Sequence, residues 1–167
     1  SYLPSLLKLI EGQFRWTALT KILEERFDAY KARTDKGEKF DLRLSLYSLT
    51  TSAAKGNIQH IQLLSFIDNV FKSLDFYLNK EEKIAIKTTL GKLLEYDNAF
   101  LNYLGELCIL NCLMSTGDYR LERTEYSLNK GGKAIDFKLL NTKTNKIVLV
   151  EVVNIELRGD KVSSHEL

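Results

Sequence analysis

The chain has 167 residues, of which 44% are hydrophobic and 28% are charged, and its formal net charge is +2. This length fits one domain or two small ones, and the composition is typical of a soluble globular protein with a sizeable core. The net charge is too small to indicate a nucleic-acid partner by itself. No apolar run approaches the ~20 residues of a membrane span, and no basic-then-apolar leader is visible, so we expect no membrane partner.

The spacing of apolar residues in the first 96 positions predicts a helical domain. The clearest amphipathic pattern runs from Leu63 to Leu78, where apolar side chains recur every three or four residues. Asn79, followed closely by two glutamates, is typical of a helix start, because asparagine caps free N–H groups and acids favour the first turn. The segment from Phe40 to Leu49 fits either an alternating strand or a helix, and its helical neighbours favour a helix.

Two cysteines, Cys108 and Cys112, lie four residues apart in one predicted helix. Their side chains leave consecutive turns of one face, which is a poor geometry for a disulfide. We therefore expect reduced core residues and a cytoplasmic protein. His60 and His165 add no zinc-ligand spacing, so a zinc site is not expected.

A helix that is apolar nearly all round is predicted from about Asp97 to Met114. In its second half the apolar residues are interrupted only by Gly105, Glu106 and Asn111. Such a helix is buried on more than one side. Glu106 is therefore an acid in an unexpected environment.

Three strands are predicted after this helix, covering Tyr119 to Leu128, Ala134 to Leu140 and Ile147 to Ile155. The polar segment from Asn141 to Lys146 suits a hairpin between the last two strands. The third strand is almost continuously apolar and β-branched, which predicts burial on both of its faces.

An acid interrupts each of the last two strands, Asp136 in one and Glu151 in the other. An ionised carboxylate inside a buried strand is strongly unfavourable unless a cation or hydrogen bonds compensate it. In an antiparallel pair the two acids lie at similar distances from the turn, so we expect cross-strand neighbours that can share one divalent cation. Carboxylates and waters suit Mg²⁺ or Mn²⁺.

An acid in one strand, a hairpin and an acid in an apolar strand resemble the core of the PD-(D/E)XK nuclease superfamily, the restriction-endonuclease-like fold. The resemblance covers roughly the C-terminal 70 residues, with Asp136 as the first acid of the motif and Glu151 as the second. In this family the preceding helix often contributes a glutamate, and Glu106 stands in that order. The chain departs from the family at Val153, where the motif has a lysine. Lys138, on the same strand face as Asp136, is the predicted replacement.

The helical pattern of the first 96 residues and the resemblance of the C-terminal part together predict an α+β fold in two parts. Residues 1–96 would form an N-terminal helical bundle, and residues 97–167 a restriction-endonuclease-like core of one helix and a three-stranded sheet. The segment after Leu157 is too short for the later helix and strand of the family, so the core is expected to be incomplete. A second copy of the chain or another protein partner is expected to cover the open sheet edge.

The implied activity is metal-dependent hydrolysis of DNA phosphodiester bonds. Glu106, Asp136 and Glu151 would hold Mg²⁺ (or Mn²⁺), which activates a water and neutralises charge on the phosphate. Asp136, Glu151 and Lys138 would be the catalytic residues, with Lys138 or Lys133 stabilising the charge of the transition state. Basic residues of the helical half would contact the DNA backbone, namely Lys31, Arg33, Lys36 and Lys39.

Two other interpretations stay open. A nuclease-like scaffold that has lost its active site would bind nucleic acid or a protein partner, and Val153 favours this possibility. A helical adaptor with a purely structural hairpin is the other, in which each acid is satisfied separately, for example Glu151 by Lys133.

Overall fold

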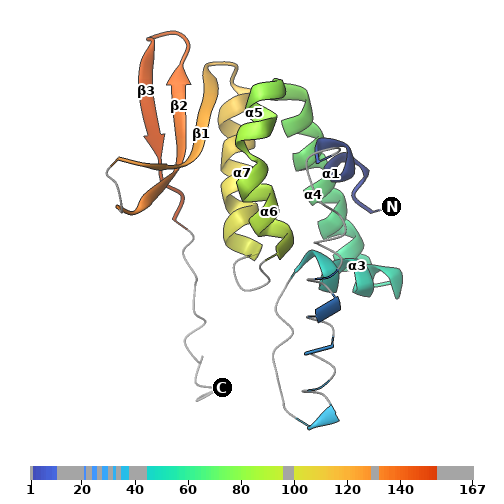
Figure 1. The fold of residues 1–167 in the computed structure, drawn as a ribbon. Coiled ribbons are helices and arrows are strands. Elements are labelled where there is room, and N and C mark those ends of the chain that lie inside the picture. The colour runs from blue at the N-terminus through green and yellow to red at the C-terminus, as the bar shows by residue number, and fades with distance from the viewer. Residues whose placement is uncertain are drawn as a thin grey trace, which may run out of the picture.

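The computed structural model describes residues 2–10, 45–95, 100–128 and 132–153, with a few positions between 21 and 37. Within these residues the fold is α+β, as predicted, with the helices mostly N-terminal and the sheet C-terminal (Figure 1). The six described helices are α1 (Pro4–Leu9), α3 (Leu46–Ala54), α4 (Ile58–Tyr77), α5 (Lys80–Ala85), α6 (Lys87–Glu95) and α7 (Phe100–Ser115). The three strands are β1 (Tyr119–Ser127), β2 (Ala134–Asn141) and β3 (Lys146–Val150).

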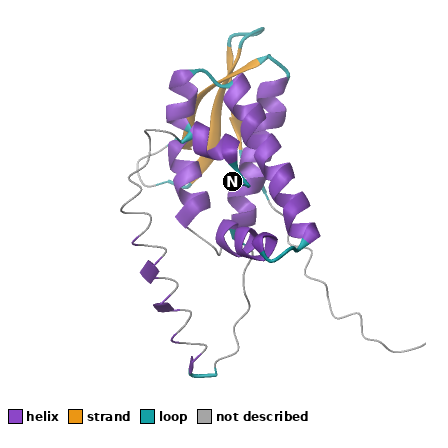
Figure 2. Ribbon diagram, turned by 90° about the vertical axis from the view of Figure 1, so that its right-hand side faces the viewer, coloured by secondary structure: helices purple, strands orange, loops and turns teal. Residues whose placement is uncertain are grey.

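The described helices cover one face of the sheet. In Figure 1 the sheet stands beside α7 and α5, and α4 and α1 lie farther from it. Turned by 90°, the same arrangement shows the helices in front of the strands (Figure 2). Helix α7 packs against α4, α6 and β1, and α5 packs against β1. Helix α7 therefore packs both against other helices and against the sheet, as its apolar sequence predicts.

The helix starts are fixed by side-chain caps. Ser45 and Ser48 form a reciprocal capping box that begins α3, so the ambiguous segment is helical from Leu46 onward, while residues 40–44 lie outside the described ones. Asn79 caps α5 as predicted and forms a capping box with Glu82. Within the described part of the chain, no helix has both the length and the apolar character that crossing a membrane requires.

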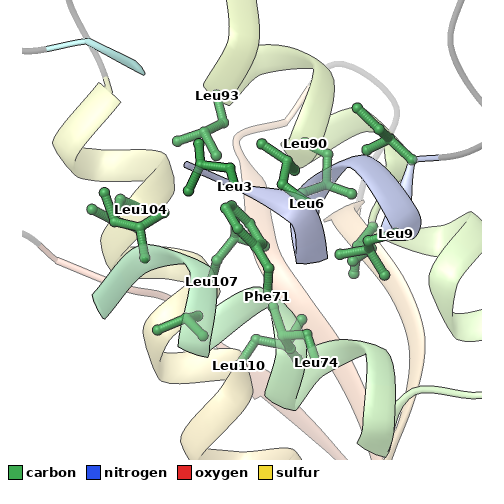
Figure 3. Close-up of a cluster of buried hydrophobic side chains, with 14 of the residues drawn as sticks. Leu3, Leu6, Leu9, Phe71, Leu74, Leu90, Leu93, Leu104, Leu107 and Leu110 are labelled. Carbon is green, nitrogen blue, oxygen red and sulfur yellow. The ribbon is translucent and has the colours of Figure 1, made fainter. Parts of the chain in front are cut away.

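One continuous core joins the helices to the sheet. Phe71 of α4 is fully buried among leucines of α1, α6 and α7 (Figure 3). The same cluster continues to Phe137 and Leu139 of β2, which are also fully buried. The predicted boundary between residues 96 and 97 lies outside the described residues, and the division into two domains stays a prediction.

The sheet has the order β1-β2-β3, and both pairs of strands are antiparallel. The predicted hairpin between the last two strands is confirmed, because Asn141 pairs with Lys146 across a turn of residues 142–145. The expectation that the third strand is buried on both faces is wrong for its described part. Strand β3 is an edge strand on a sheet that the described helices cover on one side, and Ile147 and Leu149 are 47% and 39% exposed.

The cysteines differ from expectation in one respect. Both are free thiols, but Cys112 is exposed and is not a core residue. Cys108 is half-buried, and burial raises the pKa of its thiol. The helical spacing predicts that the two thiols share a face, but it does not reveal how far that face extends beyond the packed layer.

Candidate functional site

Asp136 of β2 and Glu151 lie near each other at the open end of the hairpin. The prediction that Glu151 lies inside the third strand is wrong, because β3 ends at Val150 and Glu151 follows it. Phe137 pairs with Val150, the last residue of β3, and Asp136 and Glu151 are the next residues beyond this pair. The backbone N–H of Val152 donates a hydrogen bond of 2.6 Å to Asp136 Oδ2. The structure therefore brings these two predicted site residues together, at the point where β3 ends.

Glu106 of α7 reaches the same region from the helical layer. Burial is the main cause that raises the pKa of its carboxyl, and the negative charge of Asp136 is the next; the resulting pKa is about 7. Glu125 and Glu151 raise this pKa further, and the positive charge of Lys92 lowers it. The negative charges of Asp136 and Glu151 therefore both act on Glu106, the third predicted acid.

A fourth acid, Glu125 of β1, belongs to the same group. The pairs Thr124–Phe137 and Tyr126–Ile135 flank it, so Glu125 lies beside Asp136 across the β1–β2 ladder. Its backbone φ is +50°, a left-handed conformation that is unfavourable for a residue with a side chain. We call Glu106, Glu125, Asp136 and Glu151 the acid cluster.

Two lysines are paired with members of the acid cluster. Lys92 of α6 forms an ion pair with Glu125, and Lys133, just before β2, forms one with Glu151. Burial is the largest single influence on the pKa of Lys92 and lowers it, but the hydrogen bond to Glu125 together with the negative charges of Glu125, Tyr103 and Glu106 outweighs burial and leaves that pKa raised. The hydrogen bond to Glu151 is the main cause that raises the pKa of Lys133. Four carboxylates are therefore balanced in part by two ammonium groups.

The pKa of the Asp136 carboxyl is also raised in this environment. Burial is the largest cause that raises its pKa, the hydrogen bond from Val152 opposes it, and the charge of Glu151 adds to it. An excess of negative charge over positive charge is therefore shared between α7, β1, β2 and the end of β3.

Lys138, the lysine predicted from the sequence, is held elsewhere. Its Nζ lies 2.8 Å from a carboxylate oxygen of Glu122 and 5.1 Å from the centroid of the Tyr126 ring. The hydrogen bond to Glu122 is the main cause that raises its pKa. The structure brings Lys133 to the acids instead, and Val153 is 77% exposed.

The donor set of the acid cluster suits a hard cation, because it offers carboxylate oxygens alone. Among the described residues, no group of three or more Asp, Glu, His or Cys side chains is arranged closely enough to hold a metal ion. Of the basic residues proposed to contact DNA, Lys36 is exposed, and Lys31, Arg33 and Lys39 lie outside the described residues.

Comparison with known proteins gives no match. No family model, no curated protein and no solved structure matches this chain.

Sequence reasoning missed Glu125 and Lys92. Glu125 belongs to a strand of alternating charge, which indicates an ordinary solvent-facing acid, and nothing in the sequence signals its left-handed backbone. Lys92 looks like a charge on the polar face of an amphipathic helix. Its partner lies 33 residues away, so a local pattern does not reveal the pair.

Proposed function

We propose that the chain is a metal-dependent, nuclease-like protein that acts on DNA phosphodiester bonds. The observation that supports this most directly is the acid cluster. Acids from a buried helix and from paired strands lie close enough that their charges raise the pKa values of Glu106 and Asp136. Carboxylates that repel one another at a half-buried position are typical of functional sites.

Glu106, Asp136 and Glu151 would hold a Mg²⁺ or Mn²⁺ ion. A divalent cation fits the charge of the cluster, because its carboxylates outnumber the lysines paired with them. Bound there, such an ion would neutralise charge on a phosphate and make a water more acidic. Because these carboxylates do not lie closely enough to hold an ion in the structure described, binding requires them to move together. It also requires Glu151 to exchange its ion pair with Lys133 for the cation, and Glu106 to be ionised.

Lys133 would supply the positive charge that the motif lacks at Val153. Its side chain is 85% exposed and paired with Glu151, so it can turn from the carboxylate toward a phosphate. Its role would be to stabilise negative charge that develops on the phosphate oxygens. Lys138 is retained as the second lysine to be tested.

Manganese binding and plasmid nicking test this proposal. We expect Asp136→Ala and Glu151→Ala each to weaken Mn²⁺ binding at least about tenfold, as measured by electron paramagnetic resonance. Each variant should also abolish nicking of supercoiled plasmid in Mg²⁺. Asp118→Ala is the matched control, because Asp118 is an acid at the start of the sheet that pairs with Lys143 at 2.8 Å. Wild-type nicking by both cluster variants would remove the acid cluster from the mechanism.

The two lysines are separated by parallel substitutions. We expect Lys133→Gln to reduce nicking at least about tenfold without weakening Mn²⁺ binding, since the lysine competes with the ion for Glu151 and would act on the phosphate. Lys138→Gln should leave nicking near the wild-type rate. The reverse result would return the catalytic role to Lys138.

The alternative function is a non-catalytic nuclease-like scaffold that binds nucleic acid or a protein partner. Two observations favour it: an exposed apolar residue stands at the motif's lysine position, and Lys133 already satisfies Glu151. A wild-type protein that shifts labelled duplex DNA in a gel, with or without Mg²⁺, but never nicks it would support this alternative.

A further inference from the structure

The Lys92–Glu125 ion pair joins three elements around the acid cluster. Lys92 extends from α6 to Glu125 of β1, and its Nζ also lies 5.7 Å from the centroid of the Tyr103 ring on α7. Tyr103 precedes Glu106 by three residues, so both side chains lie on the same side of α7. Lys92 is therefore next to the turn of α7 that carries Glu106.

The backbone of β1 is distorted where it meets this lysine. In a regular strand, neighbouring side chains point to opposite faces of the sheet. Here Thr124 Oγ1 donates to the carbonyl of Ala85 in α5 at 2.8 Å, and the next residue, Glu125, also reaches a helix through Lys92. The φ of +50° at Glu125 accompanies this departure from alternation. Unfavourable backbone of this kind persists where the surroundings impose it, and it clusters at functional sites.

The environment of Lys92 makes its charge effective. Its side chain is 32% exposed, whereas that of Lys133 is 85% exposed. Charges that are partly buried are screened less by water and salt than exposed ones. Lys92 therefore acts on neighbouring carboxylates more strongly than a surface lysine at the same distance.

We propose that Lys92, held by Glu125, is a positioning residue of the acid cluster, which fixes Glu106 of α7 relative to Asp136 of β2. This inference rests on the proposed function of that cluster. Lys92 touches neither the phosphate nor the cation; it acts through Glu106. Lys92 supplies a fixed positive charge between the helical layer and the sheet. When Lys92 is removed, the carboxylates of α7, β1 and β2 repel one another with no such charge between them.

A double-mutant cycle tests the electrostatic coupling between Lys92 and Glu106 without any metal or substrate. Lys92→Gln, Glu106→Gln and the double variant are unfolded with urea at pH 8. We expect the effects on the unfolding equilibrium constant to depart from additivity by at least about threefold. Lys83 is the matched control, because it pairs with Asp75 at 2.5 Å and its side chain is 26% exposed, yet it lies in a different ion pair. Lys83→Gln and Glu106→Gln should be additive within about twofold, and additivity of Lys92→Gln with Glu106→Gln would overturn the inference.

Kinetics then separate positioning from simple stabilisation. We expect Lys92→Gln to lower kcat for plasmid nicking at least about tenfold with KM changed less than about threefold, and Lys92→Arg to restore most of kcat. Glu125→Asn should behave like Lys92→Gln, since asparagine tolerates the left-handed backbone and removes the partner of Lys92. Glu125→Asn also tests the positioning role if the Lys92→Gln variant does not fold.

The failures of the two proposals are distinguishable. A wild-type protein that neither binds Mn²⁺ nor nicks DNA overturns the proposed function, while the urea cycle still decides whether Lys92 acts on Glu106. A wild-type protein that nicks DNA, together with Lys92→Gln and Glu125→Asn variants that nick equally fast, overturns the positioning role alone.

Discussion

Glu106 is a half-buried carboxyl whose pKa is raised to about 7 by burial and by the charge of Asp136. Between about pH 4.5 and pH 7, the Glu106 carboxyl is therefore protonated in the folded protein but ionised in the unfolded chain. The contribution of Glu106 to folding stability therefore falls as pH rises through this window and is constant above it. We expect Glu106→Gln to match the wild type in urea unfolding at pH 4.5 and to exceed it by on the order of 2 kcal/mol at pH 8. An equal pH dependence in both proteins would contradict the burial and repulsion described at Glu106.

At the scale of single residues, the sequence is most informative about acids in apolar surroundings. Asp136 and Glu151 stand out among β-branched neighbours, and Glu106 stands out in an apolar helix, so each attracts attention without a structure. Lys92 and Glu125 are ordinary charges in ordinary amphipathic patterns. Their pairing depends on tertiary packing of α6 against β1 and on a left-handed backbone, and neither leaves a trace in local sequence.

Glu82 connects two elements. It is 5% exposed, and its carboxylate accepts one hydrogen bond from the N–H of Asn79 at 2.8 Å and one from the N–H of Leu121 at 2.9 Å. Glu82→Gln replaces one accepting oxygen by a donating amide, which leaves a buried N–H without an acceptor. We expect a loss of about 1–3 kcal/mol in the free energy of unfolding, measured with urea.

The neighbouring glutamate is the control for this prediction. Glu81 is exposed in the same first turn of α5. Glu81→Gln should change the free energy of unfolding by about 0.5 kcal/mol or less. Equal losses in the two variants would mean that the bridge from α5 to β1 contributes little.

At the scale of elements, local chemistry predicts where helices and strands begin better than it predicts how deeply they are buried. The cap at Asn79 and the polar turn between β2 and β3 are confirmed, because both depend on a few adjacent residues. The predicted burial of β3 on both faces is wrong, because an apolar, β-branched run suits a central strand and an edge strand alike. What decides between them is the number of neighbouring strands and covering helices, which is a property of the whole chain.

The described part of the molecule is a helical layer packed on one face of a small sheet (Figure 1). The acid cluster draws its members from α7, β1, β2 and the residue after β3. Class and order of elements follow from the sequence, since periodicity changes from helical to alternating near Ser115. The one-sided packing does not follow, because the strands carry apolar residues on both faces. Phe137 and Leu139 join the core, while Ile147 and Leu149 are 47% and 39% exposed.

One-sided packing predicts unequal responses to truncation on the two faces of the sheet. Phe137 is fully buried on the helical side, and Leu149, in the neighbouring strand, is 39% exposed. We expect Phe137→Ala to lower the free energy of unfolding by about 3–5 kcal/mol. Leu149→Ala should lower it by about 1 kcal/mol, because it removes a side chain that already contacts water. Urea unfolding at two protein concentrations checks both values. A large loss for Leu149→Ala, with a wild-type midpoint that rises with protein concentration, would mean that a second copy covers this face in solution, since stability then depends on association.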